Sequence, residues 1–452
     1  MHHAAGHSLR LSSSTPRAAA KWPTLHSSMI PMNVARPLLC LLATCAGATS
    51  TRADVLTLAQ GTNLDISALN IGACGDLAFQ ANSNSLWVAD GLVNGDLHAI
   101  NPTTGALITS RDTAAIPGLD QGPDALAVGS PTLGSNLFLF SPIGEDEGGR
   151  LNSLGALIAD YGTSRAATGA DFDNSGQLWI VSGTTPGAEV QLLRLAVADG
   201  SVLQTVPINP AITSRMVDVT FDPHTGACYV LAETTNTLLE ISLTTGNVLS
   251  TTDLTPFLIL TGRILGGVDF DATGARLFVS TGAGIGADTV VVLDRAFGAN
   301  VCSNGPGEIP CPCGNIGLAG RGCNNSFATG GGLLRTNGVP RVSADSLTLN
   351  VLGLPPTTTC LFFQGTNNPA EIFSFGDGSR CVIGSVIRLG TKPTSAGTAQ
   401  YPSGIDQLIH LRGAIPVGGA TRFYQAWYRN VAAFCTPDGF NPTNAVKVYW
   451  AP

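Results

Sequence analysis

The residues best suited to chemistry are aspartates that stand before a repeated, mostly aromatic position. We name this position the anchor, and it is occupied by Phe79, Val128, Phe172, Phe221 and Phe270. The candidate acids Asp76, Asp124 and Asp218 lie three or four residues before an anchor, and Asp171 and Asp269 lie directly before one. Converging carboxylates hold calcium or a cationic ligand in many proteins. They can equally accept hydrogen bonds from backbone amides of neighbouring strands, and we favour this second interpretation.

A second candidate is residues 171–176, whose sequence Asp-Phe-Asp-Asn-Ser-Gly has the spacing of a calcium-binding loop. Two other copies of the same segment read Phe-Asp-Pro-His-Thr-Gly and Phe-Asp-Ala-Thr-Gly, where the series of oxygen ligands is broken. An aspartate that caps a turn and a glycine with positive φ explain all three copies. We therefore expect turns and no resident cofactor, with calcium as the alternative.

Seven of the eleven cysteines lie beyond residue 300. The first four do not have the paired Cys-x-x-Cys spacing of common zinc sites, and oxidising conditions outside the cytoplasm favour disulfides. Cys360 is expected to remain free, because it stands among apolar residues within a predicted strand. Cys381 and Cys435 are the favoured long-range pair. The residues predicted to form disulfides are Cys302, Cys311, Cys313, Cys323, Cys381 and Cys435.

Catalytic chemistry is poorly supplied. Beyond residue 48 only His98, His224 and His410 remain, and they do not cluster in the sequence. No Gly-x-Ser-x-Gly elbow, phosphate-binding loop or dinucleotide-binding glycine motif stands in the right context. We expect a non-enzymatic protein, with a metal-dependent hydrolase or a lyase as the alternative.

The segment Thr421–Arg429 reads as a strand rich in aromatic residues. Tyr424, Trp427 and Tyr428 are candidates for a surface that binds a glycan, because flat rings suit sugar rings. The same alternation fits an ordinary sandwich core with a polar rim, and this is the interpretation we favour.

The elements that must position the acids recur with a period near 48 residues. Successive anchors are 49, 44, 49 and 49 residues apart, and each marks a hairpin followed by two further short strands. Four strands per repeat are typical of a β-propeller blade. The fifth copy has only three strands, and 54–58 resembles the missing one. We therefore predict five blades, or six if a divergent blade lies in 251–264, closed by pairing of the first strand with the last.

The pattern Phe-Asp-x-x-(Thr/Ser)-Gly-x-Leu-(Trp/Tyr/Phe)-Val resembles the repeats of NHL-like and YVTN-like propellers over about residues 54–298. This resemblance implies a propeller fold, while the function differs among those families.

Beyond residue 298 the repeat ends and short strands continue, which predicts a β-sandwich. This region resembles an uncharacterised cysteine-rich module at the C-terminus of secreted bacterial proteins. The resemblance rests on the motifs CPCGN, GRGCNNS, LFFQG, FGDGSRC, TRFYQAWYR and FNPTN. It implies a role in attachment, sorting or surface binding. The predicted organisation is a targeting segment at 1–48, a propeller at 49–298, a linker at 299–310 and the module at 311–452.

The beginning of the chain is typical of an export signal. Residues 32–36 give a short basic start from Met32, which this pattern favours as the true start. Residues 37–45 form an apolar run too short to span a membrane. Without 1–48 the chain has 19 basic and 31 acidic residues, with no lysine between Lys21 and Lys392. This balance excludes a nucleic-acid-binding protein. We expect a secreted or extracytoplasmic protein without a transmembrane segment, whose partner is a protein or a glycan.

Export predicts that the mature chain begins at Thr49 or Asp54, because small residues precede both positions. Mass spectrometry of the native protein checks this, and retention of Met1 or Met32 would contradict it.

Overall fold

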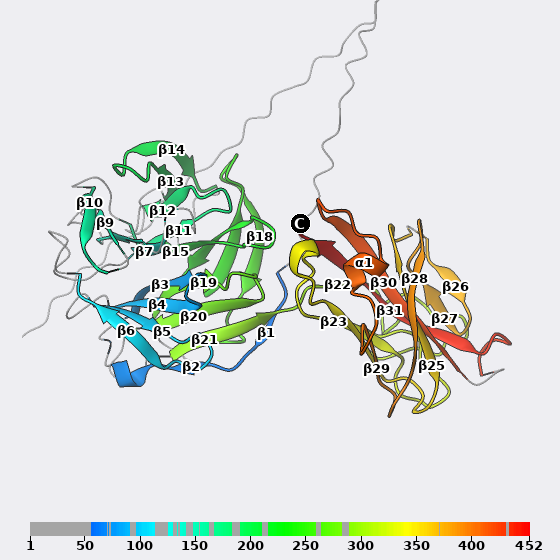
Figure 1. The fold of residues 1–452 in the computed structure, drawn as a ribbon. Coiled ribbons are helices and arrows are strands. Elements are labelled where there is room, and N and C mark those ends of the chain that lie inside the picture. The colour runs from blue at the N-terminus through cyan, green and yellow to red at the C-terminus, as the bar shows by residue number, and fades with distance from the viewer. Residues whose placement is uncertain are drawn as a thin grey trace, which may run out of the picture. The chain divides into compact units, whose positions relative to one another are not determined.

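A computed structural model describes residues 56–452 apart from short stretches, and its elements are almost all β-strands (Figure 1). The stretches outside the description are 70, 72–73, 91–95, 114–124, 130–132, 134–135, 142–147, 153, 162–166, 183–189, 210–215, 259–263, 283–288, 370 and 431–433. Within the described residues, no helix has the length and apolar character to cross a membrane.

The first half is a five-bladed propeller, as predicted, and each blade is an antiparallel sheet. The first two blades comprise β3 (Cys74–Gln80), β4 (Ser85–Asp90), β5 (Leu97–Ile100) and β6 (Leu107–Arg111), then β7 (Ala125–Val128), β8 (Leu137–Phe140), β9 (Gly148–Leu151) and β10 (Leu157–Asp160). The next two comprise β11 (Gly169–Phe172), β12 (Leu178–Ser182), β13 (Gln191–Leu195) and β14 (Val202–Pro207), then β15 (Met216–Phe221), β16 (Cys228–Ala232), β17 (Thr237–Ile241) and β18 (Val248–Asp253). Figure 1 shows the first strand of each blade near the middle of the ring and the fourth at its rim.

The fifth blade closes the ring. It contains β19 (Ile264–Phe270), β20 (Arg276–Gly282) and β21 (Thr289–Arg295), and its outer strand β1 (Leu58–Gln60) comes from the beginning of the described chain. Leu58 pairs with Arg295, and β2 (Leu64–Asp65) pairs with the other end of β21. The first strands contact one another in the order β3, β7, β11, β15, β19 and back to β3. The closing strand was predicted at 54–58 and lies slightly later in the chain.

The propeller core consists of apolar layers between neighbouring blades. The described residues form five such clusters, and each contains side chains from two adjacent blades. In one of them Trp179 of the third blade packs against Phe221 of the fourth, with ring centroids 6.3 Å apart. A blade alone would expose both faces of its sheet, so stacking around the axis is what buries these residues.

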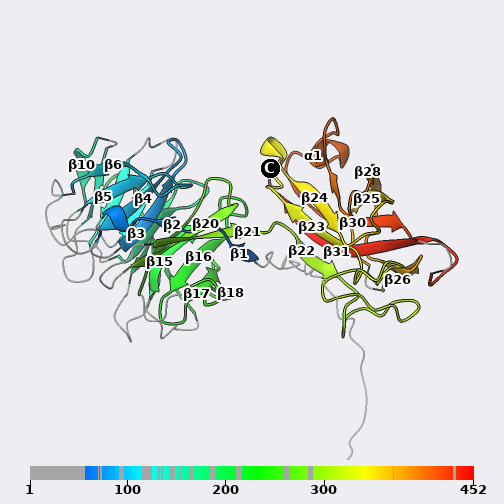
Figure 2. The ribbon, with the colours of Figure 1, turned by 90° about the horizontal axis from the view of Figure 1, so that it is seen from below.

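The second half is a β-sandwich. One sheet has the order β22 (Ala299–Cys302), β31 (Phe440–Trp450), β30 (Ala420–Arg429), β25 (Thr359–Gly365) and β28 (Ile387–Pro393) (Figure 2). The other has the order β23 (Leu333–Asn337), β24 (Thr348–Leu352) and β29 (Ala399–Tyr401). The hairpin of β26 (Phe373–Phe375) and β27 (Gly378–Arg380) and the short α1 (Ile409–Arg412) complete it. Large side chains such as Phe362, Tyr401 and Trp450 fill the core between the sheets.

The predicted linker at 299–310 is wrong in its first residues. Ala299–Cys302 form β22, which pairs with β31, so the sandwich begins directly after the propeller. This strand is difficult to recognise from the sequence, because it is short and a turn-rich stretch follows it directly.

Three disulfides stabilise the sandwich, and they use the six cysteines predicted to form them. They join Cys302 to Cys381, Cys311 to Cys323 and Cys313 to Cys435. Cys360 is buried and free, and so is Cys228 in the propeller.

The favoured Cys381–Cys435 pair is wrong. Cys381 is buried in a small cluster with Cys302, and its N–H donates to Gln425 Oε1 at 3.0 Å. Cys435 follows β30 and lies beside Asn315, with Sγ 3.7 Å from the amide oxygen. Cys313 stands two residues before Asn315, and Cys435 forms its disulfide with it. The disulfides also overturn the zinc alternative for these residues.

Loss of the closing strand is expected to destabilise the propeller. Leu56 is 4% exposed and packs against the fifth blade, so Leu56→Ala should lower the free energy of unfolding by about 2–4 kcal/mol. Deletion of 54–60 should lower it further, because the end of β21 that pairs with β1 then becomes an unpaired edge. Calorimetry measures both, with Ala59→Ser at an exposed position as the control. An unchanged melting temperature after the deletion would contradict ring closure by β1.

Reduction is expected to unfold the sandwich before the propeller. The two long disulfides close loops of 79 and 122 residues, and the chain-entropy relation gives each about 4–5 kcal/mol. Calorimetry with and without a phosphine reductant should show the unfolding transition of the sandwich move to a lower temperature. The transition of the propeller should stay where it is. Equal shifts in both, or none, would contradict independent stabilisation.

Candidate functional site

The described candidate acids, which are Asp76, Asp171, Asp218 and Asp269, lie on the innermost strands β3, β11, β15 and β19. Each described one binds the backbone amide of the residue that follows it. The distances are 2.7 Å from Leu77 N–H to Asp76, 2.6 Å from Phe172 N–H to Asp171, 2.6 Å from Val219 N–H to Asp218 and 2.7 Å from Phe270 N–H to Asp269. Asp124 lies outside the described residues.

The second oxygen of each carboxylate accepts a hydrogen bond from the next blade. Leu126 N–H donates to Asp76 at 2.7 Å, and Phe221 N–H donates to Asp171 at 2.8 Å. Val268 N–H donates to Asp218, and Phe79 N–H donates to Asp269, both at 2.6 Å. We name Asp76, Asp171, Asp218 and Asp269 the axial carboxylates. They link blade 1 to 2, blade 3 to 4, blade 4 to 5 and blade 5 to 1.

Two glycines make room for the deeper pair of carboxylates. A Cβ at Gly169 would lie 2.3 Å from an oxygen of Asp218, and one at Gly267 would lie 2.3 Å from an oxygen of Asp76. Both glycines stand three residues before an anchor, where the first and fourth blades carry Asp76 and Asp218 and the second carries Ala125. The two aspartates at this level thus face small residues on other blades.

Burial disfavours the charged form of all four groups. It raises the pKa of Asp76, Asp171 and Asp218 well above the usual range, and that of Asp269 to about 7, even though backbone hydrogen bonds oppose the shift. After burial, repulsion from the neighbouring carboxyl group of Asp76 is the next cause that raises the pKa of Asp218.

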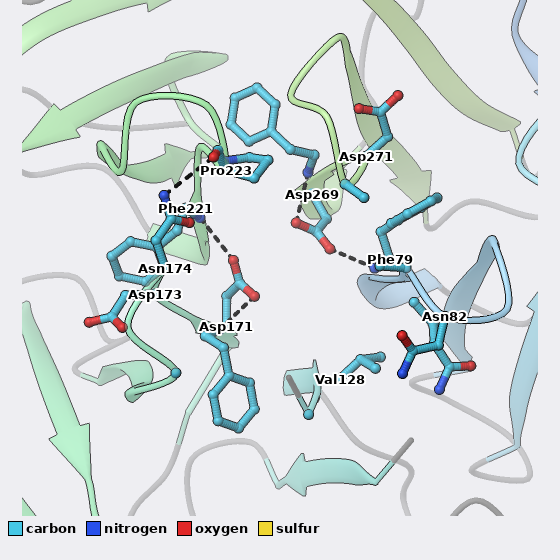
Figure 3. A pocket seen from close by; sticks show the side chains of 17 residues that line it. Phe79, Asn82, Val128, Asp171, Asp173, Asn174, Phe221, Pro223, Asp269 and Asp271 are labelled. Carbon is cyan, nitrogen blue, oxygen red and sulfur yellow. Dashed lines mark hydrogen bonds between the residues drawn. The ribbon is translucent and has the colours of Figure 1, made fainter. Parts of the chain in front are cut away.

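A cavity of about 270 Å³ opens at the end of the axis where the hairpin turns of the blades meet (Figure 3). Its wall contains the axial carboxylates Asp171 and Asp269 together with the anchors Phe79 and Phe221. Asn82 stands at its side on the β3–β4 turn, and Figure 3 shows its amide beside the open space. We name this cavity the axial pocket.

The calcium-loop candidate is a turn. Asp173 accepts hydrogen bonds from the N–H groups of Ser175 and Gln177, both at 2.9 Å, and from the indole of Trp179 at 3.0 Å. Asp271 caps the corresponding turn of the fifth blade, and Gly176 and Gly274 have φ of 76° and 71°. The oxygens that would hold calcium thus bind the backbone. Among the described residues, no three His, Cys, Asp or Glu side chains are grouped to hold a metal.

The candidate aromatics divide between core and surface. Tyr424 and Tyr428 are fully buried in the sandwich core, so a surface role for these two is wrong. Strand alternation places them on the inner face of β30, whereas Trp427 lies on the outer face beside a surface groove.

The three histidines lie in different parts of the fold. His98 bonds Ser110, His410 bonds Asp345 and His224 follows β15.

Sequence reasoning missed the role of Asn82, whereas Asp171 and Asp269 were both expected near the axis from their position directly before an anchor. Asn82 belongs to a turn whose sequence differs from the other copies, so no repeat pattern marked it.

No protein-family model matches the chain, and no curated protein matches its sequence. Among solved structures, it is similar to the glutaminyl cyclase of Myxococcus xanthus, with 14% identity, a TM-score of 0.41, and coverage of 53% of this chain and 97% of that one. The RRP9 WD40 repeats give 11% identity, a TM-score of 0.33 and coverage of 53% and 97%. Regucalcin of Agrobacterium tumefaciens, titled a calcium-binding protein, gives 18% identity, a TM-score of 0.31 and coverage of 47% and 68%. All three TM-scores lie below 0.5, so these likenesses select no function.

The axial carboxylates predict that the propeller loses stability as the pH rises. Their pKa values lie above the unfolded value of 3.8, so the folded chain binds more protons between the two values. The resulting stabilisation is complete below about pH 4 and is lost as the pH passes the folded pKa, near 7 for Asp269. Denaturant unfolding of the propeller from pH 4.5 to 7.5 should show this fall.

Asp269→Asn should make that pH dependence shallower, because the titrating group is gone. It should also lower stability at pH 5, because an amide cannot accept both backbone hydrogen bonds. Asp294→Asn on an exposed position of the same blade is the control. An unchanged slope in Asp269→Asn would refute the assignment.

Proposed function

We propose that this is an extracytoplasmic, non-enzymatic binding or scaffold protein. Its propeller presents the axial pocket to a ligand, and its disulfide-bonded sandwich attaches the protein to other material. The three disulfides support a place outside the reducing cytoplasm, in line with the predicted export signal.

The binding role rests on one observation: both carboxylates of the pocket accept hydrogen bonds from backbone N–H groups. Each of Asp171 and Asp269 accepts one amide from its own strand and one from the next blade. A general base must exchange a proton with substrate, and these hydrogen bonds occupy the oxygens that would do so. The wall is therefore fixed in shape, which suits recognition.

The chemistry of the pocket favours a ligand with an apolar body and a positive charge. The anchors supply aromatic surface, and Asn82 supplies an amide. The described residues that line the pocket include the acids Asp171, Asp173, Asp269 and Asp271 and no Lys, Arg or His. A cation in the pocket would favour the ionised form of Asp171 and Asp269.

Benzyltrimethylammonium is a suitable probe, because it combines an aromatic ring with a permanent charge. Calorimetric titration of the full mature protein should show saturable binding, stronger at pH 8 than at pH 5.5 because Asp269 has a pKa of about 7. Asn82→Trp should fill the pocket and reduce binding at least tenfold. Thr103→Trp, on the exposed β5–β6 turn of the same blade, should bind as the unaltered protein does.

Equal binding by the two tryptophan variants would place the site elsewhere. Assays of lactone hydrolysis with added calcium or manganese test the enzymatic alternative. Turnover that disappears in Asn82→Trp would make the pocket an active site and overturn the binding role.

A further inference from the structure

The outer face of the large sandwich sheet carries a groove of about 380 Å³. It crosses β25, β28 and β30, which lie side by side (Figure 2). Its lining residues are Thr359, Leu361, Arg388, Thr391, Trp427 and Arg429. This volume is within the range of pockets that take small ligands or one to two sugar units.

Strand register brings these side chains together. Leu361 pairs with Trp427 on one side and with Thr391 on the other, so an indole, an aliphatic side chain and a hydroxyl follow one another across the sheet. The indole packs against Phe440, with ring centroids 5.5 Å apart. That contact fixes the ring and leaves the half-buried Trp427 as a flat apolar wall of the groove.

The groove is basic. The guanidinium carbon of Arg429 on β30 lies 5.5 Å from the centre of the Trp427 ring, and Arg388 lies exposed on β28, on the other side of β25. No acid lines the groove. Within the described part of the chain, neither arginine forms an ion pair with a carboxylate. Both guanidinium groups are thus available to an anion.

The charge of the whole sandwich agrees with this local pattern. Residues 299–452 contain ten Lys and Arg against six Asp and Glu, a net charge of +4. Residues 49–298 contain nine against 25, a net charge of −16. The half that carries the groove is therefore net positive, and the propeller is net negative.

We propose that this groove binds an acidic saccharide, a chain of sugar units that carry carboxylates. A sugar ring lies against Trp427, Thr359 and Thr391 bind its hydroxyls, and a guanidinium of Arg388 or Arg429 pairs with its carboxylate in two parallel hydrogen bonds. A flat ring flanked by both hydroxyls and guanidinium groups matches a ring-shaped anion better than an extended acidic peptide. The proposal gives a ligand class to the attachment role of the sandwich and rests on that role.

The test is calorimetric titration of the full mature protein with a hexamer of galacturonic acid. Its carboxyl-reduced counterpart and a hexamer of glutamate are the comparison ligands. We expect binding of the acidic hexamer at least tenfold tighter than of either, with weakening as salt rises from 50 to 500 mM.

Variants assign the site. Arg388→Gln and Arg429→Gln should each weaken binding about tenfold, and Trp427→Ala should weaken it more, with partial recovery in Trp427→Phe. Arg335→Gln, at an exposed position on β23 of the other sheet, should leave binding unchanged. Because Arg388 is exposed, its replacement tests the proposal even if Trp427→Ala does not fold.

The outcomes separate the two proposals. Binding of the glutamate hexamer as tightly as the sugar would overturn the saccharide and leave the attachment role intact. If Arg335→Gln weakened binding as much as Arg388→Gln does, the groove would be refuted as the site. Failure to bind any of the three ligands would overturn the saccharide and remove the support for attachment, and the axial pocket would still be tested by benzyltrimethylammonium.

Discussion

Hydrogen bonds from one carboxylate to two blades organise the propeller around its axis. A blade by itself satisfies its backbone only within its own sheet, and apolar contact with the next blade has no direction. Asp76, Asp171, Asp218 and Asp269 add direction, because each fixes the height of one inner strand relative to the next. The apolar layers between blades then pack in one register.

Burying several carboxyl groups near one another has an electrostatic cost, and the protonated form of these groups lowers it. Four carboxyl groups lie close together at the axis, and desolvation holds their pKa values high. At the deeper level, Gly169 and Gly267 leave the space that the carboxyl groups of Asp218 and Asp76 occupy. Asp171 and Asp269 reach the axial pocket, so the same groups that join the blades also set the charge of the cavity.

The sequence was most informative where the physical pattern is local. Anchor spacing near 48 residues predicted the blades, since each hairpin needs its own turn and buried strand. The preference of the acids for backbone amides also followed from the residue types. Long-range choices were harder: the partner of Cys381 depends on which strand covers it, and a three-residue offset in the closing strand leaves the composition unchanged. Tyr424 and Trp427 differ in role by strand alternation alone, which assigns opposite faces without saying which face is covered.

Both halves of the protein join their first strand to their last. In the propeller β1 pairs with β21, more than 230 residues later, and in the sandwich β22 pairs with β31 near the end of the sequence. At typical rates of synthesis, roughly 10–50 s separate the appearance of β1 from that of its partner. During this interval each sheet keeps an open edge that could pair with another chain. Assembly of both domains is thus governed by the arrival of a late strand, and anything that holds the early strands extended and apart until then would favour correct folding.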